Sequence, residues 1–290
     1  MRRFVDLHTH SSASDGQFAP EELIRAANSL KLAAIGLTDH DTVAGLAAAR
    51  AAAANCPEMR FAPGLEISAR FPDGTMHVLA YGIDENAAAI QRVAERYRAA
   101  RDRRNPQIIA RLQQMGLAIT MADVLAAAPQ VSGEGPRRIV SRVHIAQALR
   151  QNGCVRTQQE AFDNYIGKGA PAYVEKETID PGDAIDAIHR AGGVAVLAHP
   201  VQLGCHNRAE LERIVRGLKS QGLDGIEVYH SDHTPAQTRA YLDVARRCGL
   251  GITGGSDFHG GSKPDSRLGR PRVPLAAISE EFASRIFAIG

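Results

Sequence analysis

Short apolar segments alternate with amphipathic segments over the first and last parts of the chain. The nearly uninterrupted apolar run at residues 33–38 predicts a strand that is buried on both faces. Similar patterns predict the other strands at residues 4–7, 65–67, 78–81, 194–197, 225–229 and 250–253. Helices are expected between them, beginning at Pro20 and covering residues 43–54, 183–190, 209–220 and 236–247. Strands that alternate with helices of this length predict a parallel sheet, either open or closed into a barrel.

The middle of the chain differs from its two ends. Residues 86–162 show helical periodicity and no convincing strand, and a break containing glycine and proline falls at residues 132–136. We therefore divide the chain into an α/β domain, residues 1–85 and 166–290, and a helical insertion, residues 86–165, that caps the substrate. Within the insertion, Asn105-Pro106 is expected to end a helix and to leave residues 102–105 as a turn.

Composition excludes several classes of protein. Hydrophobic residues make up 44% of the 290 and charged residues 23%, so neither a disordered nor a fibrous chain is expected. No apolar run approaches the roughly 18 residues that a membrane-spanning helix needs. The strand expected at residues 4–7 leaves no room for a signal peptide, and the four cysteines lie too far apart for a zinc-binding pair. These features predict a cytoplasmic protein with reduced thiols, and a net charge of +2 gives no argument for nucleic acid.

Histidine carries the chemical signal in this sequence. Several of the 11 histidines stand in short acidic motifs at the ends of expected strands, and His77 opens a strand. Because the carboxyl ends of parallel strands form one rim, these side chains are expected to converge there. The candidate metal ligands are His8, His10, Asp15, His40, Glu66, His77, His199, Asp257 and His259.

This set of residues suits transition metals. In His8-Thr9-His10, side chains two apart on an extended backbone point the same way, so both imidazoles can meet one ion. Imidazole with carboxylate suits manganese, iron, zinc or cobalt, whereas calcium and magnesium prefer oxygen. A single buried histidine is more often a hydrogen-bonded core residue, but motifs at six strands would need six such explanations. Nine candidate ligands are too many for one cation, so we expect two or three ions that share carboxylate ligands.

The motifs together resemble the PHP (polymerase and histidinol phosphatase) family over essentially the whole chain. They are His8-Thr9-His10, Ser14-Asp15-Gly16, Thr38-Asp39-His40, Gly64-Leu65-Glu66, His77, Ala198-His199-Pro200 and Asp257-Phe258-His259. Residues 141–146 and 167–173 resemble the stand-alone bacterial phosphoesterases, which include 3′,5′-nucleotide bisphosphate phosphatases and exoribonucleases. The resemblance implies a distorted seven-stranded (β/α) barrel related to the amidohydrolases, with up to three metal ions, foremost manganese.

The resemblance also implies how the ligands are shared among the ions. The first ion would be held by His8, His10, Glu66 and Asp257. The second would be held by Glu66, His77 and His199, with Glu66 as the bridge. The third would be held by Asp15, His40 and His259.

Clustered divalent ions lower the pKa of bound water to near neutral and clamp phosphoryl oxygens, so metal-bound water is the expected nucleophile. The sequence contains neither a GxSxG elbow nor a P-loop. His230, which follows a strand, is a candidate acid for the leaving alcohol, although it could equally lie behind the site or on the surface.

Basic residues of the insertion are the candidates for substrate selection. In the arginine-rich stretch 92–104, Tyr97, Arg101 and Arg104 share one helical face, which could grip a second phosphate or simply be solvated. The candidate substrate-binding residues are Arg101, Asp102, Arg103, Arg104, Asn105, Glu134, Arg137 and Lys168.

The leading hypothesis is a metal-dependent phosphatase that converts a nucleoside 3′,5′-bisphosphate to the nucleoside 5′-monophosphate and phosphate. A 5′–3′ exoribonuclease acting on short RNA is the runner-up, and a histidinol-phosphate-type phosphatase shares the same motifs. Hydrolysis of a C–N bond is less favoured because Glu66 occupies the position where a carbamylated lysine would be needed. A non-catalytic module is disfavoured because every ligand position is filled. No membrane and no protein partner is expected.

Overall fold

The computed structural model describes residues 3–128 and 139–287. It divides into two compact units, Met1–Ala94 with Thr178–Gly290, and Glu95–Glu177. The second unit begins and ends later along the chain than the insertion expected at residues 86–165. No helix within the described residues has the length and apolar character needed to cross a membrane.

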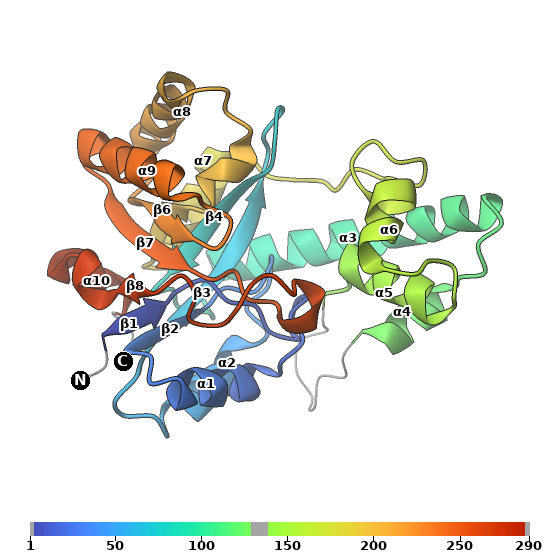
Figure 1. Cartoon of the computed structure of the whole chain (residues 1–290), viewed down its shortest axis with the longest axis horizontal. Helices are drawn as coiled ribbons and strands as arrows, with labels where there is room; N and C mark the ends of the chain where they lie inside the picture. Colours follow the sequence, from blue (N-terminus) through green and yellow to red (C-terminus); the bar gives the residue numbers. More distant parts are fainter. Residues whose placement is uncertain (1–2, 129–138, 288–290) are drawn as a thin grey trace. The chain divides into compact units, whose positions relative to one another are not determined.

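The first unit is built on one mixed sheet of eight strands in the order β7-β6-β5-β4-β3-β2-β1-β8 (Figure 1). The strands are β1 (Phe4–Asp6), β2 (Ala34–Leu37), β3 (Arg60–Ala69), β4 (Met76–Tyr81), β5 (Val194–Leu197), β6 (Gly225–His230), β7 (Gly251–Gly255) and β8 (Val273–Pro274). The sequence predicts seven of these. The eighth, β8, pairs antiparallel with the start of β1, and its two residues are too short to show a period.

The sheet closes almost completely into a barrel. Past the end of β1, the N–H of Leu7 donates to the carbonyl of Gly254 at 3.1 Å, and Thr9 and Phe258 form a parallel bridge. The two ends of the sheet therefore meet at the segments that follow β1 and β7. The barrel-like α/β fold expected from the sequence is confirmed.

The expectation of a wholly parallel sheet is wrong at β4, which runs antiparallel to both β3 and β5. The connection from Ala69 to Met76 is too short for a crossover helix, so β3 and β4 form a hairpin. His77 pairs with Ser68 near the end of β3. The start of β4 therefore lies at the edge where the parallel strands end, which explains why His77 stands at the beginning of its strand and not after the end of one.

Helices surround the sheet of the first unit. They are α1 (Pro20–Ser29), α2 (Leu46–Ala53), α7 (Pro181–Arg190), α8 (Arg208–Ser220), α9 (Pro235–Cys248) and α10 (Glu280–Ile286), with short 3₁₀ turns at Pro200–Leu203, Gly260–Ser262 and Leu275–Ala277. Helix α9 begins with Pro235 in its first turn, and its N-cap residue Thr234 accepts from the N–H of Gln237. Core side chains such as Leu7, Leu79 and Val196 are fully buried in one hydrophobic cluster, which also includes Ile286 of α10.

The second unit is helical. It contains most of α3 (Ala88–Gln114), then α4 (Met121–Ala127), α5 (Arg142–Gln151), α6 (Gln158–Ala161) and a π-helical turn at Phe162–Ile166. Its core includes Ile108, Leu112, Val124, Ile145 and Leu149.

The turn expected at residues 102–105 is wrong, because α3 continues through Pro106. A proline inside a helix costs about 3 kcal/mol. The helical turns after Pro106 bury Ile108, Ile109 and Leu112. Burial of each such side chain contributes roughly 1.5–3 kcal/mol to stability. The packing of the helix beyond Pro106 therefore outweighs the local cost of the proline.

Barrel closure predicts an effect of mutation at Gly255. A Cβ atom there would lie 2.3 Å from the backbone nitrogen of His8, so Gly255→Ala has to push two strands apart. We expect it to lower the free energy of unfolding by about 1–3 kcal/mol in chemical denaturation. Gly217→Ala on the exposed side of α8 is the control, since its Cβ meets nothing within 4 Å and alanine favours a helix. Equal stability of the two variants would contradict this account of the closure.

Candidate metal centre

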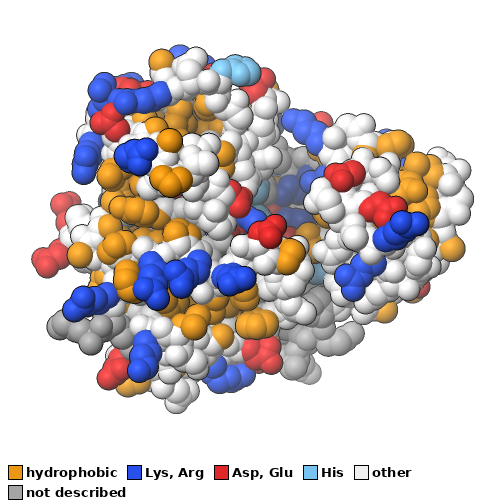
Figure 2. Space-filling view, viewed as in Figure 1, with side chains coloured by type: hydrophobic (Ala, Val, Ile, Leu, Met, Phe, Trp, Pro, Cys, Tyr) orange, Lys and Arg blue, Asp and Glu red, His pale blue; other side chains and the backbone are white. Residues whose placement is uncertain are grey.

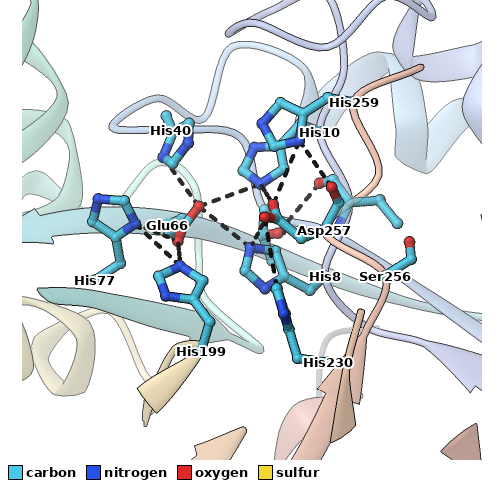
Figure 3. Close-up of polar contacts among 12 residues, drawn as sticks. His8, His10, His40, Glu66, His77, His199, His230, Ser256, Asp257 and His259 are labelled. Atoms are coloured by element: carbon cyan, nitrogen blue, oxygen red, sulfur yellow. Dashed lines mark hydrogen bonds and ion pairs between the residues drawn. The ribbon is translucent and has the colours of Figure 1, made fainter. Parts of the chain in front are cut away.

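The nine candidate ligands converge at the strand-end edge of the barrel. All of them except Asp15 are labelled in Figure 3. His8 and His10 follow β1, His40 follows β2, Glu66 lies within β3 and His77 within β4. The remaining ligands, His199, Asp257 and His259, follow β5 and β7, while Asp15 comes from the loop after β1.

The fully buried Glu66 carboxylate stands at the centre of this cluster. Its Oε2 atom lies 3.3 Å from His8 Nε2, 3.2 Å from His10 Nε2 and 3.0 Å from His40 Nδ1. The ligand atoms of His8, His10, Glu66 and Asp257 all lie within 4.8 Å of one another. These are the four residues of the first expected ligand set.

The other oxygen of Glu66 faces the second expected set. Its Oε1 atom lies 2.7 Å from His77 Nδ1 and 2.8 Å from His199 Nε2. These two imidazole nitrogens are 3.3 Å apart. Glu66 thus contacts both sets, as a bridging carboxylate would.

The third expected set, Asp15, His40 and His259, also comes together, and His10 joins it within 4.8 Å. His259 Nδ1 contacts the backbone carbonyl of Asp257 at 2.9 Å, so its Nε2 is left to face Asp15 Oδ1 at 3.4 Å. His10 therefore stands between the first and third sets, which is a feature that the sequence did not indicate.

Whether this site fits metal ions can be judged from its buried polar atoms that make no hydrogen bond. Such atoms are His8 Nε2, both ring nitrogens of His10, Asp15 Oδ1, Glu66 Oε2, His199 Nδ1 and His230 Nε2. Leaving a polar atom buried and unsatisfied costs about 1–3 kcal/mol. Concentrating so many in one place is therefore expensive for a site that holds only protein, whereas cations would satisfy the bare nitrogens and the carboxylate oxygens among them. The mix of imidazole and carboxylate fits divalent transition metals.

The carboxylates of the cluster are ionised. Burial raises the pKa of Asp15, but the imidazoles of His40 and His259 outweigh it and hold that pKa well below its usual value. The same balance holds the pKa of Asp257 low, through His259 and His8. Burial lowers the pKa of His40 to about 3, which keeps that ring in its neutral, metal-binding form. The site therefore presents ionised carboxylates, and at His40 a neutral imidazole, to a cation.

Sequence reasoning missed the carboxylates that hold these ligands in place. Glu227 of β6 is fully buried; one of its oxygens lies 3.0 Å from His8 Nδ1 and the other accepts the N–H of His199 at 2.8 Å. Asp39 accepts from Ser11 and Ser14 and so braces the loop after β1. Glu227 could have been found, because it is a lone acid within an apolar strand, as Glu66 is.

His230 and His8 differ in which ring nitrogen carries the proton, an assignment that follows from their hydrogen bonds. His8 Nδ1 donates to Glu227, which leaves its Nε2 bare for a metal. His230 Nδ1 instead accepts the N–H of Asp232 at 3.1 Å, so its Nε2 carries the proton. That Nε2 is buried and lies 3.6 Å from Asp257 Oδ2. His230 thus presents an N–H group beside the cluster, and the surface location left open by the sequence is wrong.

The structure places the described substrate-binding candidates in the second unit. Arg101, Arg104 and Asn105 are buried, and the guanidinium of Arg104 donates to Asn105 Oδ1 at 2.8 Å. The alternative of a solvated face is therefore wrong for these two arginines.

The other candidates are exposed or lie elsewhere. Asp102 pairs with Arg98 at 3.2 Å and Arg103 pairs with Glu177 at 2.8 Å, both on the exposed side of α3. Lys168 is also exposed. Glu134 and Arg137 lie outside the described residues.

A histidine and carboxylate cluster at the strand ends of an α/β barrel defines a metal-dependent hydrolase site. The family model of the PHP domain matches residues 6–169, so the chain belongs to the PHP family. A 3′,5′-nucleoside bisphosphate phosphatase from Chromobacterium violaceum is 34% identical over 88% of this chain and 87% of its own. A 5′-3′ exoribonuclease from Haemophilus influenzae is 32% identical over 89% and 91%.

A solved structure supports the same assignment. The chain from Bifidobacterium adolescentis, assigned as a metal-dependent phosphoesterase, has a TM-score of 0.84 and 33% identity over 98% of this chain and 95% of its own. Together with the family match, these relatives identify the protein as a metal-dependent phosphoesterase.

The contacts of Glu227 predict that replacing this residue lowers metal affinity without loss of the fold. The wild-type protein is expected to hold two to three divalent ions per chain by elemental analysis. Because Glu227 orients His8, Glu227→Gln should lower metal affinity about tenfold to a hundredfold, measured by competition with a chelator. Glu280→Gln, at an exposed position of α10, is the control. Wild-type affinity in Glu227→Gln would show that this carboxylate does not support the ligands.

Proposed function

We propose that the protein removes one phosphate from a nucleoside 3′,5′-bisphosphate and leaves the nucleoside 5′-monophosphate. The observation that carries the proposal is the Glu66-centred cluster in a chain that is 34% identical, over 88% of its length, to a phosphatase of that name. To cleave a phosphate ester, a protein chiefly has to position the substrate and neutralise its charge, and the cluster is suited to both.

Three groups of residues would hold the metal ions, for which manganese is our first choice and iron, zinc or cobalt the alternatives. When bound, the ions would neutralise phosphoryl oxygens and lower the pKa of a water molecule that serves as nucleophile. Glu66 would orient imidazoles on both of its sides, since its two oxygens face different ligand sets. Glu227 would keep the His8 ring in the tautomer that a metal requires.

His230 would assist the departure of the leaving alcohol. Its Nδ1 accepts the N–H of Asp232, so its Nε2–H would donate a hydrogen bond to the leaving oxygen and stabilise the negative charge that develops there. The ring is 2% exposed and lies between Asp257 and the segment after β6, which limits its rotation. This role of His230 depends on the direction in which its Nε2–H group points.

The second phosphate of the substrate would be held by the insertion. Arg101 and Arg104 are buried on one face of α3, and a partly desolvated guanidinium binds phosphate more strongly than an exposed one. Lys168 would contribute a point charge. Asp102, Arg103, Asn105, Glu134 and Arg137 remain candidates for contacts with the sugar, the base or the same phosphate.

An exoribonuclease acting on short RNA is the second candidate, favoured by the Haemophilus influenzae relative. On the face shown in Figure 2, basic side chains lie among acidic and apolar ones, as the net charge of +2 would suggest. This mixture suits a small nucleotide better than a long nucleic acid. We also infer a cytoplasmic location, because the four cysteines are free thiols.

A substrate panel tests the proposed function directly. With manganese, adenosine 3′,5′-bisphosphate should be hydrolysed with a larger kcat/KM than short 5′-phosphorylated RNA or histidinol phosphate. Phosphate release and nucleotide analysis by chromatography would measure both the rate and the position of cleavage. Faster hydrolysis of RNA would favour the exoribonuclease instead, and Asp257→Asn should be inactive on every substrate.

The proton on His230 predicts a dependence on the leaving group. His230→Asn should lower kcat on a nucleotide, whose alkoxide leaves poorly, by about 10²–10³-fold. The same variant should lose far less on an aryl phosphate, because the charge of a departing phenolate is delocalised into its ring and needs less stabilisation. Metal content serves as the control and should stay at the wild-type level. Equal losses on both substrates would argue against a hydrogen bond from His230 to the leaving oxygen.

Substrate selectivity is predicted to depend on Arg104. A charge-assisted contact contributes about 1.5–3 kcal/mol, so Arg104→Ala should lower kcat/KM on a bisphosphate roughly ten- to a hundredfold. Lys168→Ala should act in the same direction. Both variants should keep their rate on an aryl monophosphate, which offers no second phosphate. Arg92→Ala is the matched control, because that arginine is exposed on the same helix. Equal losses on both substrates would refute the selectivity argument.

A further inference from the structure

A lysine stands against the metal centre at a position that neither the sequence motifs nor the proposed reaction uses. Lys263 follows the 3₁₀ turn Gly260–Ser262, and its Nζ lies 2.9 Å from Asp257 Oδ2 and 3.0 Å from Asp232 Oδ2. The turn is tied down because the N–H of Gly261 donates to Gln17 Oε1 at 2.7 Å. The ammonium therefore has a defined place between two carboxylates.

The two oxygens of Asp257 have different neighbours. Oδ1 lies 3.4 Å from His8 Nε2 and 3.1 Å from His10 Nε2, toward the first ligand set. Oδ2 contacts Lys263 and lies 3.6 Å from His230 Nε2. Lys263 thus forms an ion pair with Asp257 Oδ2, the oxygen that would otherwise be open to a second contact with a metal ion.

His230, Asp232 and Asp257 also form a cation-binding pattern of their own. Their ligand atoms lie within 4.8 Å of one another, as in the three expected metal sets. His230 is nevertheless unsuited to bind a metal, because its Nε2 carries the proton. A positive charge is still needed here, since Asp257 is buried and Asp232 faces it from the segment after β6. The Lys263 ammonium supplies that charge.

We propose that Lys263 is a built-in cation that fills the His230–Asp232–Asp257 group and restricts Asp257 to one oxygen toward the metal ions. The inference rests on the proposed metal site and adds a residue that tunes it. A fixed ammonium beside divalent ions repels them, so Lys263 weakens metal binding while it positions Asp257. It is a positioning residue, and its removal should strengthen metal binding. A residue that only supported the local structure would do the opposite.

The test compares manganese affinity in variants of the whole protein. Occupancy is followed against free Mn²⁺ set by a competing chelator, in wild type, Lys263→Met, Lys263→Gln and Lys263→Arg. Removal of a unit charge beside a divalent ion changes affinity by roughly tenfold or more even in a polar environment. The two neutral variants should therefore reach half occupancy at about tenfold lower free Mn²⁺, and Lys263→Arg should match wild type.

Lys31→Met is the matched control for net charge. Lys31 is exposed just before β2, at the strand's beginning, whereas the cluster lies beyond its end. This variant should bind manganese as wild type does. Neutral variants of Lys263 that bind manganese no more tightly than wild type would overturn the inference while leaving the metal site intact. A wild-type protein that binds no manganese would overturn the metal site and the inference with it.

Discussion

The ionised Glu66 carboxylate, buried at 0% exposure, is the interaction on which the site depends. An unpaired carboxylate in this position would cost several kcal/mol of desolvation. Five imidazole nitrogens lie within 2.7–3.3 Å of its two oxygens on opposite sides, and divalent ions held among these groups would offset that cost. Because those imidazoles come from β4 and from the ends of β1, β2 and β5, the barrel has to bring those segments to one point. The fold and the site therefore impose the same geometric requirement.

That requirement is met partly by strained backbone. Asp41 and Asp257 adopt positive φ values of 55° and 51°, a region that residues other than glycine rarely enter. Both are held by hydrogen bonds, from Asp41 N–H to Glu66 carbonyl and from Asp257 N–H to His8 carbonyl, each 2.9 Å. Strain of this kind persists where surrounding contacts determine the conformation, as they do at active sites. The turns after β2 and β7 thereby aim their side chains at the cluster.

The relatives of this chain carry different activity names, phosphatase and exoribonuclease, on the same family of barrel. A common cluster can serve both activities, because each requires water to attack a phosphorus atom beside clustered cations. In our proposal the barrel determines the reaction and the insertion selects the substrate. Lys263 adds a third level, since it would set how tightly the ions are held without touching the substrate.

Seven of the eight strands, the fold class and the family could be predicted from the sequence, because burial on both faces and the His-x-His motif are properties of neighbouring residues. The convergence of the ligands that follow β1, β2, β5 and β7 was expected from the rule that parallel strands end at one edge, whereas the division into three sets came from the family resemblance. The direction of β4, the short β8 and the course of α3 through Pro106 could not be predicted, because distant pairing and packing outweigh local preference there. Glu227, the proton on His230 Nε2 and the place of Lys263 likewise depend on partners elsewhere in the chain. Sequence by itself thus determined which nine side chains are the candidate ligands, because residue type and motif are local, and tertiary structure decided how each is oriented and what holds it.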